Sequence, residues 1–300
     1  MLRIAVIGMG SNSLRMLVAD IDKETLNKVG RYRKGLRMFA ALDENHFIVD
    51  EMIQIACVEV ADYVQLAKLN GAEKIYLFAT SAVRDAKNQV AFSKRIEEYT
   101  GVPLEVCDGE MEALLGFVGA TSGGYEGMID IGGGSTEIAI GQGTKLDYQR
   151  SLQLGAVRLF RAQPIVHAGD VENSWNVCKE IIKNEVDEIT SHNVERWIGV
   201  GGTLTATAAF VKQLQDTERS KVDGLVLFQV DVLNAIKTLA PMSLEERKKL
   251  PYLHPQRADI VVHGIVILYS LMHHLSIKQI EVSCSGNLEG YAILKYLYNI

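Results

Sequence analysis

The stretch that decides the fold is IDIGGGSTE at residues 129–137, because a similar pattern, IGMGSNSLR, stands earlier at residues 7–15. The two stretches align without gaps at an offset of 122 residues, and apolar, strand-like segments flank both. Either the likeness is a chance similarity of two Gly/Ser turns, or the chain contains a duplicated lobe. A duplication predicts two like domains facing each other across a cleft. The alignment also exposes a difference, since Gly8 stands where the second copy has Asp130.

Strands and helices alternate outward from these two turns. Each turn has a predicted strand on both sides, and further predicted strands lie at residues 75–79, 197–200 and 279–283. Apolar periodicity predicts helices at residues 51–69, 109–120, 170–189, from 203 onward, 230–239, 257–275 and 287–298. This alternation is typical of an α/β fold.

The composition is that of a globular protein whose charges are unevenly spread. The 300 residues carry a net charge of −6 and are 48% hydrophobic, and a chain of this length usually forms about two domains. Residues 1–40 hold eight basic and three acidic side chains, whereas residues 101–140 hold seven carboxylates and no Lys or Arg. Such a balance disfavours a nucleic-acid-binding domain. The charge distribution allows two interpretations. One is a binding site that combines a cationic lobe with a carboxylate-rich strip, and the other is a surface whose charges are merely unevenly spread.

The cysteines and the N-terminus indicate a cytoplasmic protein. The cysteines are widely separated, with no CxxC or zinc spacing, at Cys57, Cys107, Cys178 and Cys284. Four such cysteines without a signal peptide indicate buried thiols in a reducing compartment. No run of about 18 apolar residues occurs, so we expect no membrane span.

Three glycine-rich turns have the composition of phosphate-binding loops. Tight turns of this kind direct several backbone N–H groups at one point, and missing Cβ atoms let phosphate oxygens approach. The turn at residues 199–203 also leads into a predicted helix, whose N-terminus favours anions. Taken singly, each is also compatible with an ordinary turn. The candidate phosphate-binding residues are Ser11, Asn12, Ser13, Gly133, Gly134, Ser135, Thr136, Gly201, Gly202 and Thr203.

Two carboxylates, Asp130 and Glu137, flank the triple glycine. Bare carboxylates repel phosphate, so both could face a bound phosphate only through a cation. Mg²⁺ takes one or two carboxylates together with substrate phosphates and water. The spacing therefore predicts a Mg²⁺–phosphate site at these two residues. The alternative, solvated carboxylates at strand ends, fits less well because Asp130 lies inside an apolar strand.

Other catalytic motifs are absent from the sequence. It contains no Walker A loop, no Gly-x-Ser-x-Gly elbow and no His-Glu-x-x-His helix. The seven histidines form no metal-ligand spacing.

Taken in order, the motifs resemble the Ppx/GppA family of exopolyphosphatases and guanosine pentaphosphate phosphohydrolases, within the actin, sugar kinase and Hsp70 ATPase superfamily. The resemblance is carried by GSNS at 10–13, ATSAVRDA at 79–86, DIGGGSTE at 130–137, LGAVRL at 154–159, GVGGT at 199–203 and RAD at 257–259. It implies two duplicated ribonuclease-H-like domains around a cleft, residues 1–120 and 121–300, with a C-terminal helix at about 287–300 that packs back on the first domain.

The resemblance also implies roles for individual residues. In the family, the glutamate before alanine at the start of a helix activates the attacking water, and Glu112 of DGEMEA at 108–113 matches it. Glu110, two residues earlier and on another helix face, is the alternative. The arginine of the second motif maps to Arg84 as a phosphate clamp, since a guanidinium suits phosphate. Arg15 and Arg37 are expected to form a substrate track.

Three features depart from the family pattern. Gly8 replaces the aspartate usual in the first strand, so one expected contributor to the metal site is missing. In the segment GNLEG at 286–290, Leu288 replaces the arginine of Gly-Leu-Arg-Glu-Gly. The chain is also expected to lack the HD-type helical domain of longer family members.

The leading prediction is an exopolyphosphatase that acts on inorganic polyphosphate and depends on Mg²⁺ or another divalent cation. The first alternative is guanosine pentaphosphate 5′-phosphohydrolase, and the second is a weakly active or non-catalytic phosphate or nucleotide sensor, suggested by Gly8. A kinase of the same superfamily is a fourth reading. We expect no nucleic-acid or membrane partner and, from the family, a homodimer.

Overall fold

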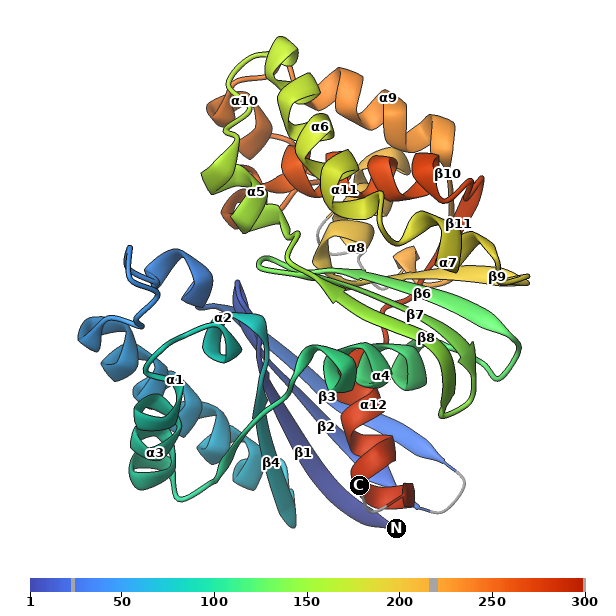
Figure 1. The fold of residues 1–300 in the computed structure, drawn as a ribbon. Helices are drawn as coiled ribbons and strands as arrows, with labels where there is room; N and C mark the ends of the chain where they lie inside the picture. The colour runs from blue at the N-terminus through green and yellow to red at the C-terminus, as the bar shows by residue number, and fades with distance from the viewer. Residues whose placement is uncertain (23–24, 216–220, 299–300) are drawn as a thin grey trace. The chain divides into compact units, whose positions relative to one another are not determined.

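A computed structural model describes residues 1–22, 25–215 and 221–298 of the chain. The chain divides into two compact units (Figure 1). One unit comprises Met1–Gly119 together with Asn287–Ile300, and the other comprises Ala120–Gly286.

The first unit is built on a five-stranded sheet with the order β3-β2-β1-β4-β5. Its strands are β1 (Leu2–Met9), β2 (Ser13–Ile21), β3 (Leu26–Gly35), β4 (Lys74–Ala79) and β5 (Leu104–Val106). The pairs β1–β2 and β2–β3 are antiparallel, whereas β1–β4 and β4–β5 are parallel.

Helices cover both faces of this sheet. Helices α1 (Asp50–Leu69) and α3 (Gln89–Thr100) lie on one face, and α4 (Gly109–Ala120) and α12 (Asn287–Ile293) lie on the other (Figure 1). Short turns of helix are η1 (Met38–Ala41), α2 (Ser81–Arg84) and the final π-helical turn η5 (Leu294–Tyr298). The α12 face buries an apolar cluster that includes Val6, Phe78, Leu115, Leu288 and Tyr291.

The second unit is built on a six-stranded sheet with the order β10-β11-β9-β6-β7-β8. Its strands are β6 (Glu126–Ile131), β7 (Thr136–Gln142), β8 (Lys145–Leu152), β9 (Arg196–Val200), β10 (Val226–Phe228) and β11 (Gln279–Val282). The helices are α5 (Ala156–Ala162), α6 (Val171–Ile182), α7 (Val186–Thr190), α8 (Gly201–Val211), α9 (Gln229–Leu239), α10 (Leu244–Lys248) and α11 (Val261–His274), with the 3₁₀ turns η2 (Ala168–Asp170) and η4 (Pro255–Arg257).

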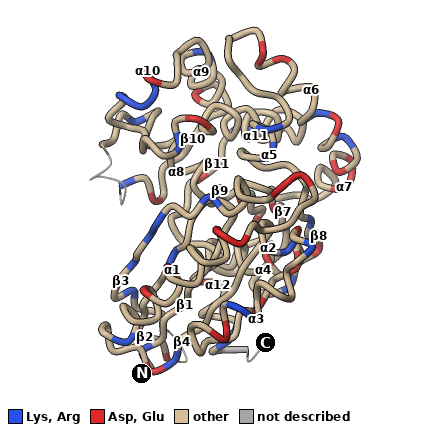
Figure 2. The backbone as a smooth tube through the Cα atoms, turned by 90° about the vertical axis from the view of Figure 1, so that its left-hand side faces the viewer, with Lys and Arg blue, Asp and Glu red and all other residues tan. Residues whose placement is uncertain are grey.

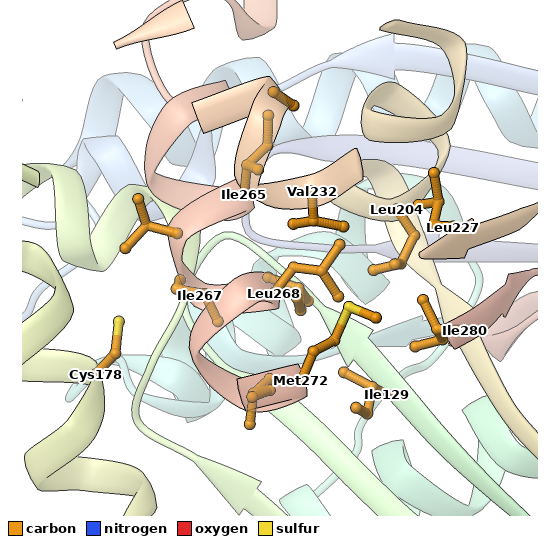
Figure 3. Close-up of a cluster of buried hydrophobic side chains, with 14 of the residues drawn as sticks. Ile129, Cys178, Leu204, Leu227, Val232, Ile265, Ile267, Leu268, Met272 and Ile280 are labelled. Atoms are coloured by element: carbon orange, nitrogen blue, oxygen red, sulfur yellow. The ribbon is translucent and has the colours of Figure 1, made fainter. Parts of the chain in front are cut away.

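Helix α11 is the centre of the second unit's core. Eleven of its side chains or backbone positions are buried, and Figure 3 shows Ile265, Ile267, Leu268 and Met272 among residues from the sheet and from neighbouring helices. A helix that is buried on all sides is apolar on all sides, and this explains why the sequence of α11 is almost continuously apolar.

The duplication expected from the two glycine turns is confirmed by the strand pairing. The order β3-β2-β1-β4-β5 corresponds to β8-β7-β6-β9-β11. In the first unit Gly8 pairs with Arg15, and in the second Asp130 pairs with Glu137, so both members of the pair shift by the same 122 residues. The repeat therefore extends from the sequence to the hydrogen-bond register.

The elements differ from the sequence-based expectations in several places. The sequence analysis did not predict strands β3, β5, β8 and β10 or helices α2, α3, α5 and α10. The expected helix 170–189 is broken into α6 and α7, the expected helix 257–275 begins only at Val261, and the expected helix 287–298 passes into a π-helical turn at Leu294. Among the described residues, no helix has both the length and the apolar character needed to cross a membrane.

Candidate active site

The first glycine turn joins β1 to β2 and is closed by its own backbone. The Gly10 N–H donates to the Ser13 carbonyl at 3.0 Å, and the carbonyls of Ser11 and Asn12 accept N–H groups from the segment that enters η1. The N–H groups of Ser11 and Asn12 have no partner among the described residues. A turn whose carbonyls are occupied and whose N–H groups remain available is suited to binding an anion.

The second glycine turn repeats this arrangement in the other unit. The Gly132 N–H donates to the Ser135 carbonyl at 2.9 Å, and the Gly133 carbonyl accepts the N–H groups of Val157 and Arg158 at the start of α5. The Arg158 guanidinium donates to the Gly134 carbonyl at 2.6 Å. Across the part of the chain that the structure describes, the N–H groups of Gly133 and Gly134 have no acceptor.

Hydroxyl groups in the second unit are partly committed to the backbone. The Thr136 hydroxyl is fully buried and donates to the Leu154 carbonyl at 2.5 Å, and the Thr203 hydroxyl donates to the Ile131 carbonyl at 3.3 Å. Ser135 is also buried, with 2% of its surface exposed. These contacts fix the turn, so the backbone N–H groups are its better-placed donors toward a ligand.

The third turn, between β9 and α8, needs glycine at two positions. Gly201 has a φ of +90°, and a Cβ there would lie 2.2 Å from Oδ1 of Asp130. A Cβ on Gly202 would lie 1.8 Å from Nη1 of Arg257. The carboxylate of Asp130 and the guanidinium of Arg257 therefore fill the space beside these two glycines, against the N-terminus of α8. Arg257, the first residue of the RAD motif at 257–259, is therefore a further candidate phosphate-binding residue.

The carboxylates of Asp130 and Glu137 occupy directly paired positions on β6 and β7. Side chains at such positions lie on the same face with their Cβ atoms about 5 Å apart. Both residues are buried, with 7% and 1% exposed, and Oε1 of Glu137 accepts a hydrogen bond from Ser151 at 2.7 Å. Two buried carboxylates side by side fit a hard divalent cation that takes its other ligands from phosphate and water. No group of three or more His, Cys, Asp or Glu side chains suited to holding a metal occurs within residues 1–22, 25–215 and 221–298.

Glu112 lies in the first turn of α4, where Asp108 caps the helix by accepting the Met111 N–H at 2.7 Å. Its side chain is buried, with 6% exposed, and its Oε2 lies 2.7 Å from Nη1 of Arg84. Glu110, the alternative, is exposed. Of the two glutamates, therefore, Glu112 is the buried one, and it is paired with Arg84.

The Arg84 side chain contacts several groups of the first unit. Besides Glu112, its Nη1 donates to the Cys107 carbonyl at 3.3 Å, and its Nε lies 3.8 Å from Asp85. A guanidinium has five N–H donors, so these contacts are compatible with a further phosphate contact. The role of Arg84 as a phosphate clamp stays a prediction.

The motif around Arg84 is tied to the first glycine turn. The Ser81 and Ser11 hydroxyls are hydrogen-bonded at 2.7 Å, and the Thr80 N–H donates to the Met9 carbonyl at 3.1 Å. Nearby, burial raises the pKa of the Cys107 thiol to about 12, with smaller contributions from neighbouring carboxylates. The thiol beside Glu112 is therefore protonated at neutral pH and is not a nucleophile.

The two expected track arginines lie beside the same turn. Nη2 of Arg15 is 3.8 Å from the position that a Cβ on Gly10 would occupy. Arg37, which is exposed and has a φ of 51°, donates its backbone N–H to the Asn12 carbonyl at 3.2 Å. In the first unit, the structure thus brings together the turn, Arg15, Arg37, Arg84 and Glu112. In the second unit it brings together the other two turns, Asp130, Glu137 and Arg257.

Comparisons with known proteins find the family that the sequence motifs resemble. A model of the Ppx/GppA phosphatase family matches residues 17–298. The chain is 27% identical to exopolyphosphatase 2 of Mycobacterium tuberculosis, over 97% of this chain and 98% of that protein. It is 28% identical to a guanosine-5′-triphosphate,3′-diphosphate pyrophosphatase of Pseudoalteromonas translucida, over 98% of this chain and 60% of the relative.

Comparison with solved structures likewise finds a protein described as a Ppx/GppA enzyme. The solved structure of the Aquifex aeolicus PPX-GPPA enzyme superposes with a TM-score of 0.82 at 25% identity, covering 97% of this chain and 99% of that one. Together with the strand order of the two sheets, this confirms the expected α/β fold of two ribonuclease-H-like, actin-like domains.

Proposed function

The chain belongs to the Ppx/GppA phosphatase family, and from that premise we propose that it is an exopolyphosphatase that removes the terminal phosphate of inorganic polyphosphate. Its membership makes it a phosphohydrolase. The choice of polyphosphate is supported by the likeness to exopolyphosphatase 2 over nearly the full length of both chains. Polyphosphate also needs only donors and cations along its length, which are the groups gathered at the first glycine turn.

The observation that carries this proposal is the enclosed Glu112–Arg84 pair. A general base must be held in place within hydrogen-bonding reach of the water that it activates. Arg84 fixes one oxygen of Glu112 at 2.7 Å, and a carboxylate has enough lone pairs to accept from water as well. We assign Glu112 as the base.

In the proposed step, the water oxygen attacks the terminal phosphorus while the bond to the bridging oxygen breaks. Glu112 takes a proton from the water, orthophosphate leaves, and the polyphosphate chain departs one phosphate shorter. The turn N–H groups of Ser11, Asn12, Gly133 and Gly134 would bind phosphate oxygens. Asp130 and Glu137 would hold Mg²⁺, which when bound supplies charge neutralisation on those oxygens.

Substitution of the base tests this assignment. We expect Glu112→Gln to lower the rate of phosphate release from polyphosphate by at least about 100-fold, because removal of a general base typically costs a factor of 10² to 10⁴. Glu110→Gln is the matched control, since it removes the same charge from an exposed position on the same helix turn. The measurement is phosphate release under saturating substrate, with thermal unfolding to verify the fold.

Wild-type turnover in Glu112→Gln would contradict the assignment of Glu112 as the general base. Equal losses in Glu112→Gln and Glu110→Gln would also contradict it, because the assignment rests on the buried glutamate and not on the exposed one.

The second candidate is guanosine pentaphosphate 5′-phosphohydrolase, which is favoured by the likeness to the Pseudoalteromonas pyrophosphatase. Side-by-side assays of phosphate release from polyphosphate and from guanosine pentaphosphate separate the two activities. The sensor alternative, motivated by Gly8, would show polyphosphate binding by calorimetry with no release at millimolar Mg²⁺. Cytoplasmic location and homodimer formation stay predictions.

A further inference from the structure

Helix α10 of the second unit buries one of its charged side chains. Figure 2 shows its acidic and basic positions, which are Glu245, Glu246, Arg247 and Lys248. Three of them are exposed, whereas Arg247 has 5% of its surface exposed. A capping box fixes the start of the helix, because the Ser243 hydroxyl accepts the Glu246 N–H at 3.3 Å and the Glu246 carboxylate accepts the Ser243 N–H at 2.7 Å. The helix therefore holds one guanidinium inside the second unit.

The Arg247 guanidinium contacts the RAD motif at residues 257–259. Its Nη1 donates to the carbonyl of Ala258, a fully buried residue, at 3.1 Å. Its Nε is buried and has no hydrogen-bond partner among the described residues. Because a buried carbonyl needs a donor, the bond from Arg247 joins α10 to the RAD motif.

Burial of this guanidinium is electrostatically unfavourable. Burial lowers the pKa of Arg247, and the negative charge of Asp259 opposes this shift without cancelling it. Across residues 1–22, 25–215 and 221–298, no carboxylate forms an ion pair with Arg247. A buried charge without a paired countercharge is costly, and local costs of this kind are typical of functional sites. The contact of Arg247 with Ala258 is therefore a candidate for a functional role.

The residue before Ala258 is Arg257, whose guanidinium lies at the third glycine turn, between β9 and α8. A Cβ on Gly202 would lie 1.8 Å from Nη1 and 2.1 Å from Nη2 of Arg257, so the guanidinium lies directly over this glycine. Gly202 is in the first turn of α8, whose N-terminus carries a partial positive charge. An anion that contacts both the guanidinium and the helix N-terminus is favoured by both, and phosphate is such an anion.

Hydrogen bonds within the segment give the turn around Arg257 its shape. The Arg257 N–H donates to the His254 carbonyl at 2.9 Å, and the Ile260 N–H donates to the Arg257 carbonyl at 3.1 Å. Both bonds join residues three positions apart, so they do not restrain where the turn lies relative to other helices. The bond from Arg247 comes from a different helix, and it restrains that position.

We propose that Arg247 is a positioning residue: by binding the Ala258 carbonyl, it holds the neighbouring Arg257 guanidinium over Gly202, where Arg257 binds a phosphate group of the substrate. This inference deepens the proposed function and rests on it for the identity of the substrate. Arg247 itself does not contact the substrate in this role, and its effect passes through Arg257. Removal of the Arg257 guanidinium should therefore abolish the contribution of Arg247.

A double-mutant cycle tests the inference, with the full chain and polyphosphate as the substrate. Arg247→Met removes the charge and the donors and keeps a long side chain. We expect it to lower kcat/KM by about tenfold, as for the loss of one charge-assisted hydrogen bond between Arg257 and phosphate. In the Arg257→Gln background, the same substitution should change kcat/KM by less than about twofold, because the guanidinium that Arg247 positions is absent.

Lys248→Met is the matched control. Lys248 follows Arg247 on α10, is exposed and pairs with Glu245 at 2.7 Å. Its substitution removes the same charge from the same helix, so kcat/KM should stay within about twofold of the wild-type value. Thermal unfolding verifies that each variant is folded at the assay temperature. If Arg247→Met is unfolded there, the smaller polar variant Arg247→Gln takes its place in the cycle.

Two outcomes would overturn the inference. One is a kcat/KM in Arg247→Met equal to that in Lys248→Met. The other is an equal loss with and without the Arg257 guanidinium, which is the result expected if Arg247 only supports the fold.

Failure of the inference is distinguishable from failure of the proposed function. If the wild type releases no phosphate from polyphosphate, the hydrolase proposal fails. The same cycle is then measured by calorimetry through binding of inorganic triphosphate at millimolar Mg²⁺. Coupling between Arg247 and Arg257 in that binding supports the positioning role, and additive losses or no binding overturn it.

Discussion

At the residue scale, His263 is a fully buried histidine close to charged groups of the second unit. Its Nε2 accepts the Ile165 N–H at 3.2 Å, and its ring meets Phe160 edge-on with centroids 5.3 Å apart. Burial lowers its pKa from 6.5 to about 4, and the charge of Arg247 acts in the same direction. The histidine is therefore neutral in the folded protein at physiological pH.

This shift makes the stability of the fold depend on pH. Between pH 6.5 and about 4 the unfolded chain binds a proton at His263 that the folded chain does not, so stability falls as the pH falls. We expect His263→Gln, which cannot titrate, to lose less stability than wild type between pH 7 and pH 4, by at most about 3 kcal/mol. Urea unfolding at pH 7, 5.5 and 4 measures the difference, and a gap between the two proteins that stays constant with pH would contradict the prediction.

At the element scale, the contact of β1 with α12 joins two departures from the family pattern. Gly8 and Leu288 are 280 positions apart in the sequence, yet a Cβ on Gly8 would touch Leu288 at 3.0 Å. The missing aspartate and the missing arginine are therefore neighbours. Where the family pattern has a carboxylate and a guanidinium, this chain has a glycine and an apolar side chain that fills the space.

Restoring the two charges should show this coupling. We expect Gly8→Asp to destabilise the protein by at least about 3 kcal/mol, because it buries an unpaired carboxylate among apolar groups. The Gly8→Asp/Leu288→Arg double variant should cost at least about 1 kcal/mol less than the sum of the two single variants. A double-mutant cycle by urea unfolding measures the coupling, and additive losses would show that the two replacements are independent.

The elements that the sequence predicted correctly are those with a buried, regular pattern. Strands β1 and β6 were predicted from short apolar runs beside the glycine turns, and helix α1 from its apolar periodicity. Helix α4 was predicted from Asp108, which caps it. Strand β3 was missed because it is an edge strand whose side chains, such as Lys28 and Arg33, are mostly exposed and charged. Charged residues are typical of protected edges, so their presence conceals the strand from a search for apolar alternation.

Within the site, short-range relations were predictable and long-range ones were not. The seven-residue spacing of Asp130 and Glu137 around a tight turn is enough to predict that they face each other, and the register pairs them. The contact of Arg84 with Glu112 spans 28 residues, and that of Arg257 with Gly202 joins separate elements. Such contacts depend on how helices pack, which no local pattern specifies.

At the scale of the whole molecule, the net charge of −6 conceals a cationic segment at residues 1–40, where Lys and Arg exceed Asp and Glu by five. That segment contains the first glycine turn, Arg15, Arg33 and Arg37. The proposed polyanionic substrate would thus meet a positive region on a chain that is negative overall, and screening by salt should weaken its attraction.

We expect KM for long-chain polyphosphate to rise severalfold when NaCl is raised from about 50 to about 300 mM, with little change in kcat, because salt screens exposed charges on the scale of a Debye length of about 10 Å. Steady-state kinetics at constant Mg²⁺ measures this dependence. Unchanged KM over that range would contradict a role for the cationic segment in binding.

The return of α12 to the first unit has a consequence for how the chain folds. Its residues Leu288, Tyr291 and Ala292 complete the apolar cluster on β1 and β4, although the whole second unit intervenes in the sequence. During synthesis, the second unit is continuous and can close its core as soon as it emerges, whereas the N-terminal sheet must wait for the last helix. The unit made first is therefore finished last, and until then its exposed apolar face is open to aggregation or to capture by a chaperone.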